Sequence, residues 1–496
     1  MRIFARKNVE EDEEKSLERE RKQFIKMTQT PMAKLIIGLG IPTTLSMMVT
    51  SLYNLADMYF VSLLGNPYAT SAASNLLALM SIIQAIGFTY GMGSGSIVSR
   101  LLGKRDREGA DKVASSSLFI AVISGLLITL VGFIFFEPLL KLMGSVNVNT
   151  LEHSKIYGCY VLIGAPIMCM SFVLNNILRA EGKALLSMVG LVTGAVVNVV
   201  LDPILIFAAN MGIEGAAIAT LFSQILSFAI LIFMFLSGKT IVRMRIRAIS
   251  RQFSVYKDVI TTGFPSFCRQ ILSSLCSVFL NNAAYTCGVD VYGITMADGI
   301  VVFDGGVEAQ TALGVVQKVF MLAFSLSLGI GQGYQPVLGY NYSAKRFDRV
   351  KSAYLFTLGF STTVMLVFAT VCFIFASNLM GAFSLSDTAK EIGTLSLRLQ
   401  CLCMPLLPLN FMAGITYQSV GSKAIAALLS ISRQGLFYIP AVLILPELFS
   451  LLGVQCCQSV SDFLSFFFAM PFTFMFFKTI KKEQEKLETE QKNATA

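Results

Sequence analysis

An apolar stretch with one acidic residue inside it, residues 34–64, most constrains how this chain can fold. A run of about 20 to 30 mostly apolar residues is long enough to cross a bilayer as a helix. Asp57 lies deep in the stretch, where a charge costs about 2.5–3.5 kcal/mol on insertion scales. Thr50, Tyr53 and Asn54 precede Asp57 at helical spacing and form one polar stripe with it. We expect this stripe to face protein or water rather than lipid.

The composition excludes an ordinary soluble protein. Of the 496 residues, 54% are hydrophobic and 14% are charged, and there is no Trp. The formal charge of +9 does not suggest nucleic-acid binding, because the basic residues are spread over short connections between apolar runs. No cleaved signal peptide is expected, since residues 1–33 form a charged tail without a short apolar core. The chain is therefore predicted to be an all-α polytopic membrane protein.

Apolar runs bounded by charges, Gly or Pro predict twelve transmembrane helices. Their expected ranges are 34–64, 69–99, 113–136, 155–178, 185–209, 213–237, 258–285, 307–335, 349–376, 393–417, 424–446 and 452–478. A second charged tail follows at residues 479–496.

The distribution of Lys and Arg predicts the orientation. Basic residues gather in both tails and in the even-numbered connections, including the linker at residues 238–257, whereas the odd-numbered connections hold Lys141, Lys155 and Lys390 alone. Under the positive-inside rule, both termini are cytoplasmic. We expect a multi-pass protein of the cell (plasma) membrane that functions as a monomer.

Two halves of the sequence repeat. Gly91, Gly93 and Gly95 recur at a near-constant offset as a second Gly-x-Gly-x-Gly pattern at residues 329–333, and Pro203 recurs as Pro440. The pattern predicts two pseudo-symmetric six-helix lobes in the same orientation, residues 34–237 and 258–478. The glycines are expected to allow close helix packing, because neither a strand nor a Walker-type Lys-Ser/Thr accompanies them.

Ionisable side chains inside the predicted spans are unevenly divided. The first half holds the deep acids Asp57 and Asp202, whereas the second holds deep bases. These bases are Arg269, Lys318, Arg398 and Arg433. Asn198 and Asp202 are four residues apart on one helix face, and Pro203 interrupts the backbone next to the acid. We expect Arg398 and Arg433 to serve structure or gating.

The polar residues of the first six spans predict one pocket that couples transport to an ion. Two carboxylates in a low-dielectric site repel each other, so the pair can take up or release a proton near neutral pH. Their oxygens, with amide and hydroxyl partners, also suit Na⁺. The alternative is that Asp57 and Asp202 are structural groups that hold helices together. The predicted coupling residues are Tyr53, Asp57, Asn175, Asn198, Asp202 and Thr220, and the possible Na⁺ ligands among them are Asp57, Asn198, Asp202 and Thr220.

A substrate pocket is predicted beside these residues. Flexible thioether and aromatic side chains can adapt to varied organic cations. The residues assigned to it are Asn54, Gln224, Met321 and Phe324. The ten cysteines and the single His153 show no metal-ligand spacing, so no catalytic residue, metal centre or cofactor other than the coupling ion is expected.

Five motifs together resemble the multidrug and toxic compound extrusion (MATE) family, in its bacterial DinF-like or MepA-like branch. They lie at residues 54–61 (NLADMYFV), 179–183 (RAEGK), 198–206 (NVVLDPILI), 212–220 (GIEGAAIAT) and 331–342 (GQGYQPVLGYNY). The resemblance covers residues 30–480. It implies two six-helix lobes around a central cavity and export of organic cations against entering H⁺ or Na⁺ by alternating access. It also places the cation site on the six coupling residues named above and a bending proline at Pro42.

The sequence departs from the family between Tyr285 and Glu308. An insertion at about residues 286–306 carries Asp290, Asp298 and Asp304 and has no Lys or Arg, so it is expected outside the cell. It is either a tolerated surface insertion or an acidic attractant for cations. The carboxylate that some members carry in the second lobe has no counterpart in the seventh or tenth span, apart from Asp258 at an edge.

These features predict a secondary active antiporter that exports small amphipathic, cationic molecules in exchange for H⁺ or Na⁺. A flippase for lipid-linked oligosaccharides or other lipids is the alternative, and it would need a more strongly cationic cavity. An intramembrane enzyme is not expected, because it would need a nucleophile, a metal cluster or a His-Glu pair at membrane depth. A channel fits poorly with two lobes in one chain.

Overall fold

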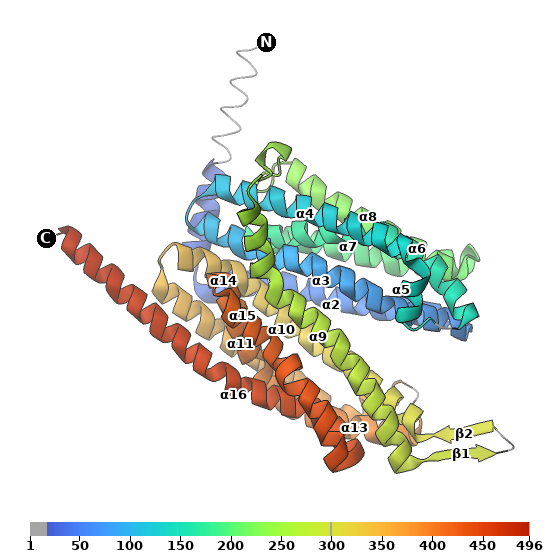
Figure 1. Ribbon diagram of the computed structural model, residues 1–496. Helices are drawn as coiled ribbons and strands as arrows, with labels where there is room; N and C mark the ends of the chain where they lie inside the picture. Colours follow the sequence, from blue (N-terminus) through green and yellow to red (C-terminus); the bar gives the residue numbers. More distant parts are fainter. Residues whose placement is uncertain (1–16, 146, 298–299, 384, 496) are drawn as a thin grey trace, which may run out of the picture.

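The computed structural model describes residues 17–145, 147–297, 300–383 and 385–495 as a helical protein built from two bundles. In Figure 1 the bundles separate toward the end of the molecule that carries the two short strands. The first bundle contains α2 (Met32–Ser62), α3 (Pro67–Gly103), α4 (Arg107–Ile134), α5 (Phe136–Leu142), α6 (Val148–Ala180), α7 (Ala184–Pro203), the π-helical η1 (Ile204–Ala208) and α8 (Gly212–Leu236).

The second bundle repeats this order after the short η2 (Ile246–Ala248). It contains α9 (Phe253–Tyr292), β1 (Ile294–Ala297), β2 (Ile300–Asp304), α10 (Gly305–Ser343), α11 (Phe347–Ile374), α12 (Ala376–Gly381), α13 (Asp387–Cys403), η3 (Met404–Leu406), α14 (Leu407–Val420), α15 (Lys423–Ile431), the π-helical η4 (Ser432–Tyr438) and α16 (Ile439–Thr495). The two π-helical segments lie in corresponding spans, fifth and eleventh, which agrees with the predicted repeat.

The predicted spans are confirmed with two qualifications. Ten helical stretches of the described residues are long and apolar enough to cross a membrane, and α9 is long but less apolar than these. The last stretch, residues 423–493, contains both final spans, because the chain reverses at Ser450, whose φ of 50° and ψ of −132° are not helical. With α9 included and this stretch divided at Ser450, the twelve predicted spans are accounted for.

The predicted insertion at about residues 286–306 is partly helical. α9 continues to Tyr292 and so contains Asp290, and residues 294–297 and 300–304 pair as the two strands of an antiparallel hairpin, with Ile294 opposite Asp304. Asp304 also caps α10, since its Oδ1 accepts a hydrogen bond from the Gly306 backbone N–H at 2.9 Å. Asp298 lies outside the described residues.

The two bundles meet through close backbone contacts. α2 packs on α10, and α3 packs on α9 and α10. A Cβ atom on Gly333 would lie 2.5 Å from the Gly40 Cα, and one on Gly93 would lie 2.2 Å from the Val259 carbonyl oxygen. The predicted packing role of the repeated glycines is therefore confirmed.

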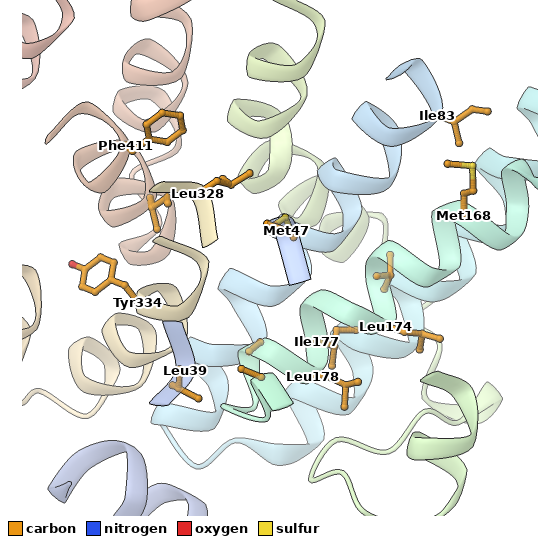
Figure 2. Packing of buried hydrophobic residues seen from close by; sticks show 14 of the residues in the cluster. Leu39, Met47, Ile83, Met168, Leu174, Ile177, Leu178, Leu328, Tyr334 and Phe411 are labelled. Carbon is orange, nitrogen blue, oxygen red and sulfur yellow. The ribbon is translucent and has the colours of Figure 1, made fainter. Parts of the chain in front are cut away.

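The core shared by both bundles surrounds α2. Figure 2 shows Leu39 and Met47 of α2 between Leu328 and Tyr334 of α10 on one side and Ile177 of α6 on the other. All ten cysteines are unpaired and are buried or half-buried, as small apolar packing groups are.

Hydrogen bonds join the bundles at the end opposite the hairpin. Gln335 Nε2 donates to Ser96 Oγ at 2.6 Å, Asn341 Nδ2 to the Met27 carbonyl at 3.0 Å, and Arg349 Nη2 to the Thr30 carbonyl at 2.6 Å. The segment before α2, helical at residues 17–29, is therefore part of this contact rather than a free tail.

Replacing Gly263 of α9 tests how closely the two bundles pack. A Cβ there would lie 1.8 Å from the Thr89 carbonyl oxygen of α3. Because a backbone atom must move to make room, Gly263→Ala is expected to lower the free energy of unfolding by about 1–3 kcal/mol. Thermal unfolding of the purified protein in detergent measures this change.

The matched control is Gly359→Ala in α11, where nothing lies within 4 Å of the added Cβ. Alanine favours a helix over glycine by about 0.5–1 kcal/mol, so this variant should be as stable as the unmodified protein or slightly more stable. Equal melting temperatures for the two variants would contradict the predicted interlocking of α3 and α9.

Candidate functional site

The first bundle contains a buried acidic cluster that joins four helices. Asp57 of α2 is 8% exposed, and its Oδ2 accepts a hydrogen bond from the Tyr157 hydroxyl of α6 at 3.2 Å. The Tyr157 hydroxyl also interacts with the Thr220 side chain of α8. Asn198 of α7 donates from Nδ2 to Thr220 Oγ1 at 3.4 Å and to Asp202 Oδ1 at 3.2 Å. The two carboxylates are thus the ends of one polar chain.

The local sequence explains the position of Asp202. Asn198 and Asp202 are one helical turn apart on α7, so their side chains meet on one face. Pro203 follows directly and lacks a backbone N–H, and the helix changes to the wider π-helical geometry of η1 at Ile204. Asp202 is fully buried at this irregular point.

Three oxygen atoms of the cluster have no hydrogen-bond donor among the described residues. These are Asp57 Oδ1, Asn198 Oδ1 and Asp202 Oδ2. Neither carboxylate forms an ion pair with a basic side chain in the described part of the chain, and the two charges lie close enough to repel each other. Buried acceptors without donors are costly, so the cluster can hold a proton or a small cation bound by oxygen atoms.

The structure brings together four of the predicted coupling residues and adds one. Asp57, Asn198, Asp202 and Thr220 lie in the cluster as described. Tyr157 was not predicted from the sequence, although a Tyr inside an apolar span needs a hydrogen-bond partner and could have been considered on that ground. Tyr53 lies near both carboxylates and faces the central cavity described below.

The structure places Asn175 outside this hydrogen-bonded cluster, and its coupling role stays a prediction. Its side-chain oxygen accepts a hydrogen bond from Arg179, one helical turn further along α6, and its Nδ2 donates to the Ser187 carbonyl at 3.3 Å. The guanidinium of Arg179 also donates from Nε to Ser187 Oγ at 3.2 Å. Asn175 therefore belongs to a separate polar contact between α6 and α7, because a buried arginine occupies its oxygen.

Pro42 lies inside α2, which is helical from Met32 to Ser62. The Ser46 hydroxyl donates to the Pro42 carbonyl at 2.7 Å, and the Thr43 hydroxyl donates to the Leu39 carbonyl at 2.6 Å. Proline and such side-chain bonds to the backbone both weaken the regular helix and favour bending. A kink at Pro42 remains a prediction.

A cavity of about 550 Å³ lies between the two bundles. The four predicted substrate residues, Asn54, Gln224, Met321 and Phe324, all line it. Tyr53, Asn175, Asn198 and Thr220 line it as well. Asp57 and Asp202 do not, so Asn198 and Thr220 connect the cavity wall with the carboxylates behind it. The volume suits a drug-sized molecule.

Known proteins resemble this chain in sequence and in architecture. The MatE family matches residues 42–204 and 290–444, more than half of the chain. The multidrug export protein MepA of Staphylococcus aureus is 24% identical over 450 residues, which are 90% of this chain and 95% of that protein. These matches agree with the resemblance found in the motifs.

Solved structures give the same result. An outward-facing multidrug resistance MATE transporter of the MOP superfamily superimposes with a TM-score of 0.84 at 27% identity, covering 92% of this chain and 98% of that chain. A MATE structure in the straight conformation gives a TM-score of 0.85 at 27% identity, covering 93% of this chain and 99% of that chain. The protein therefore has the MOP-type fold of a multi-pass transporter, and it belongs to the MatE family.

Proposed function

We propose that this protein is a secondary active antiporter that exports small amphipathic molecules in exchange for H⁺ or Na⁺. The observation that carries the proposal is the acidic cluster of the first bundle, whose unpaired oxygens lie directly behind the wall of a cavity shared by both bundles. The relatives named as multidrug exporters support the direction and the class of cargo.

Asn198 and Thr220 can couple ion binding to substrate release, because both belong to the acidic cluster and to the cavity wall. When a proton or Na⁺ binds Asp57 or Asp202, the repulsion between the carboxylates falls and the free oxygens gain a partner. Asn198 and Thr220 must then adjust their hydrogen bonds, and both also form the cavity wall. We infer that bending of α2 near Pro42 accompanies this change and releases the substrate outward.

The contacts between the bundles support alternating access. The hydrogen bonds from Gln335, Asn341 and Arg349 join the bundles at the end of the termini, and the hydroxyls of Ser51 and Ser325, 2.7 Å apart, join them midway. We assign this arrangement to the outward-facing state, with both termini in the cytoplasm of a cell-membrane protein that acts as a monomer.

The cavity wall contains side chains that favour opposite charges on the exported molecule. The predicted preference for cations finds support in the aromatic and methionine residues of the cavity. The charged side chains in the wall are basic, however, and the described lining contains no Asp or Glu. A basic cavity is also the feature expected of a lipid flippase, but the similarity to multidrug export proteins favours the exporter.

Neutralising either acid tests the coupling role. Asp57→Asn and Asp202→Asn keep the shape of the side chain but remove the ionisable group, so gradient-driven export should fall at least about tenfold. The measurement is dye transport in proteoliposomes under an imposed pH gradient or an imposed Na⁺ gradient, which also identifies the coupling ion.

Asp258→Asn is the matched control. Asp258 pairs with Lys423 at 2.8 Å on an exposed surface away from the cluster, so its loss should leave transport near that of the unmodified protein. If the Asp57 and Asp202 variants exported dye at the full rate, the acidic cluster would not be the coupling site.

Tyr157→Phe tests how Asp57 is held. Among the described residues, Asp57 accepts its hydrogen bond from the Tyr157 hydroxyl, at 3.2 Å. Leaving a buried carboxylate without this donor costs about 1–3 kcal/mol of folding free energy. We expect a lower melting temperature for this variant. Tyr160→Phe, which removes a bond to Glu214 near the surface, should change it much less, and equal shifts would contradict a special role for Tyr157.

A further inference from the structure

The wall that the second bundle contributes to the cavity is basic. Arg269 of α9, Lys318 of α10 and Arg433 of η4 all line it, and Arg179 lines it from the first bundle. Among the described lining residues there is no carboxylate to balance these charges. Asp57 and Asp202 of the first bundle are not among the lining residues.

Arg269 and Lys318 lack an acidic partner among the described residues. Neither has a carboxylate within 4.0 Å in the described part of the chain. The Arg269 guanidinium carbon instead lies 5.8 Å from the centroid of the Phe411 ring. An aromatic face offsets only part of the cost of keeping a cation in the interior of a membrane protein.

Arg433 is only partly satisfied. Its Nε donates to Asp462 Oδ1 at 2.7 Å, and the same oxygen accepts a bond from Gln458 at 2.8 Å. Its Nη2 is buried and has no partner among the described residues, although the residue is only 5% exposed and lines the cavity. Asp462 therefore balances one guanidinium and leaves the charges of Arg269 and Lys318 uncompensated.

The two arginines converge on one aromatic surface. The guanidinium carbons of Arg269 and Arg433 both lie within 6.0 Å of the Phe411 ring centroid, and Arg433 also lies 5.2 Å from that of Phe320. Phe324 packs against Phe411 at 5.1 Å with an interplanar angle of 74°. Guanidinium groups are well suited to bind a carboxylate, and the rings of Phe320 and Phe324, which line the cavity, are suited to stack on an aromatic ligand.

We propose that this wall, formed by Arg269, Lys318 and Arg433 with the adjoining phenylalanines, binds a carboxylate group of the exported molecule. The preferred cargo is then an aromatic amphiphile that bears an anionic group, including zwitterions whose cationic part faces the polar first bundle. This inference rests on the proposed export function and specifies its substrate class. The structural and gating role expected for Arg433 from the sequence thereby extends to substrate contact.

A matched pair of dyes tests the proposal. Rhodamine 110 carries a free carboxylate, and rhodamine 123 is its methyl ester, so the two differ in the group that the basic wall would recognise. Equilibrium binding to the purified full-length protein is followed by fluorescence anisotropy at low salt and without an ion gradient. We expect the unmodified protein to bind rhodamine 110 at least about tenfold more tightly than rhodamine 123.

Five variants localise the effect. Arg269→Gln and Lys318→Gln should each reduce the preference for the carboxylate dye, and the double variant should remove it without weakening rhodamine 123 binding. Arg269→Lys keeps the positive charge and should retain part of the preference. Arg398→Gln is the control, because Arg398 lies in a span but outside the cavity lining, near the Phe373 ring, and it should leave both affinities unchanged.

Several outcomes would overturn the proposal. They are equal or tighter binding of the ester by the unmodified protein, binding of neither dye by monodisperse protein, and an equal loss of both dyes in Arg269→Gln. If the ester is nevertheless exported in a gradient-dependent way, the export function stands and only the anion site fails. Carboxylate-selective binding without any gradient-driven export would instead refute the exporter and leave the site.

Discussion

The structure depends on two carboxylates that are buried without a counter-charge. Asp57 and Asp202 would each be stabilised by a nearby lysine or arginine, yet the described residues offer them only Tyr157 and Asn198 as donors. Neutral donors are enough to hold the carboxylates in place, but they leave one oxygen of each group free. A permanent salt bridge would be more stable and could not exchange its cation, because the basic side chain would already occupy the site.

Close packing at one end of the molecule makes the cavity possible. At the end of the termini the bundles approach so closely that Gly333 lies against the backbone of Gly40 and Gly263 against that of Thr89. Side chains larger than hydrogen at these positions would hold the bundles apart there. Toward the hairpin the bundles separate, and Figure 1 shows them diverging there.

Features that depend on spacing along one helix could be predicted from the sequence, whereas contacts between helices could not. The apolar runs gave the spans, and the four-residue separation of Asn198 and Asp202 gave their contact. Tyr157 and Asn175 lie on one face of α6 about five helical turns apart, and the helix that packs against α6 at each depth decides that the first meets Asp57 while the second meets Ser187. The contact of Asn175 with Arg179, by contrast, spans one turn of α6 and follows from spacing. The boundary of α9 was misplaced because the hairpin continues from the helix, with strands too short to produce a clear pattern.

The two bundles repeat one architecture, but they differ in whether their buried carboxylates have basic partners. The first leaves Asp57 and Asp202 without basic partners among the described residues, whereas the second pairs its buried Asp462 with Arg433 and adds Gln458 as a further donor. An acid already neutralised by a guanidinium gains little from a proton or Na⁺, so ion coupling is favoured in the first bundle. The surplus of positive charge in the second bundle then faces the cavity, where a ligand can balance it. Duplication followed by this division would give one protein a cation site and an anion site on opposite walls of a single cavity.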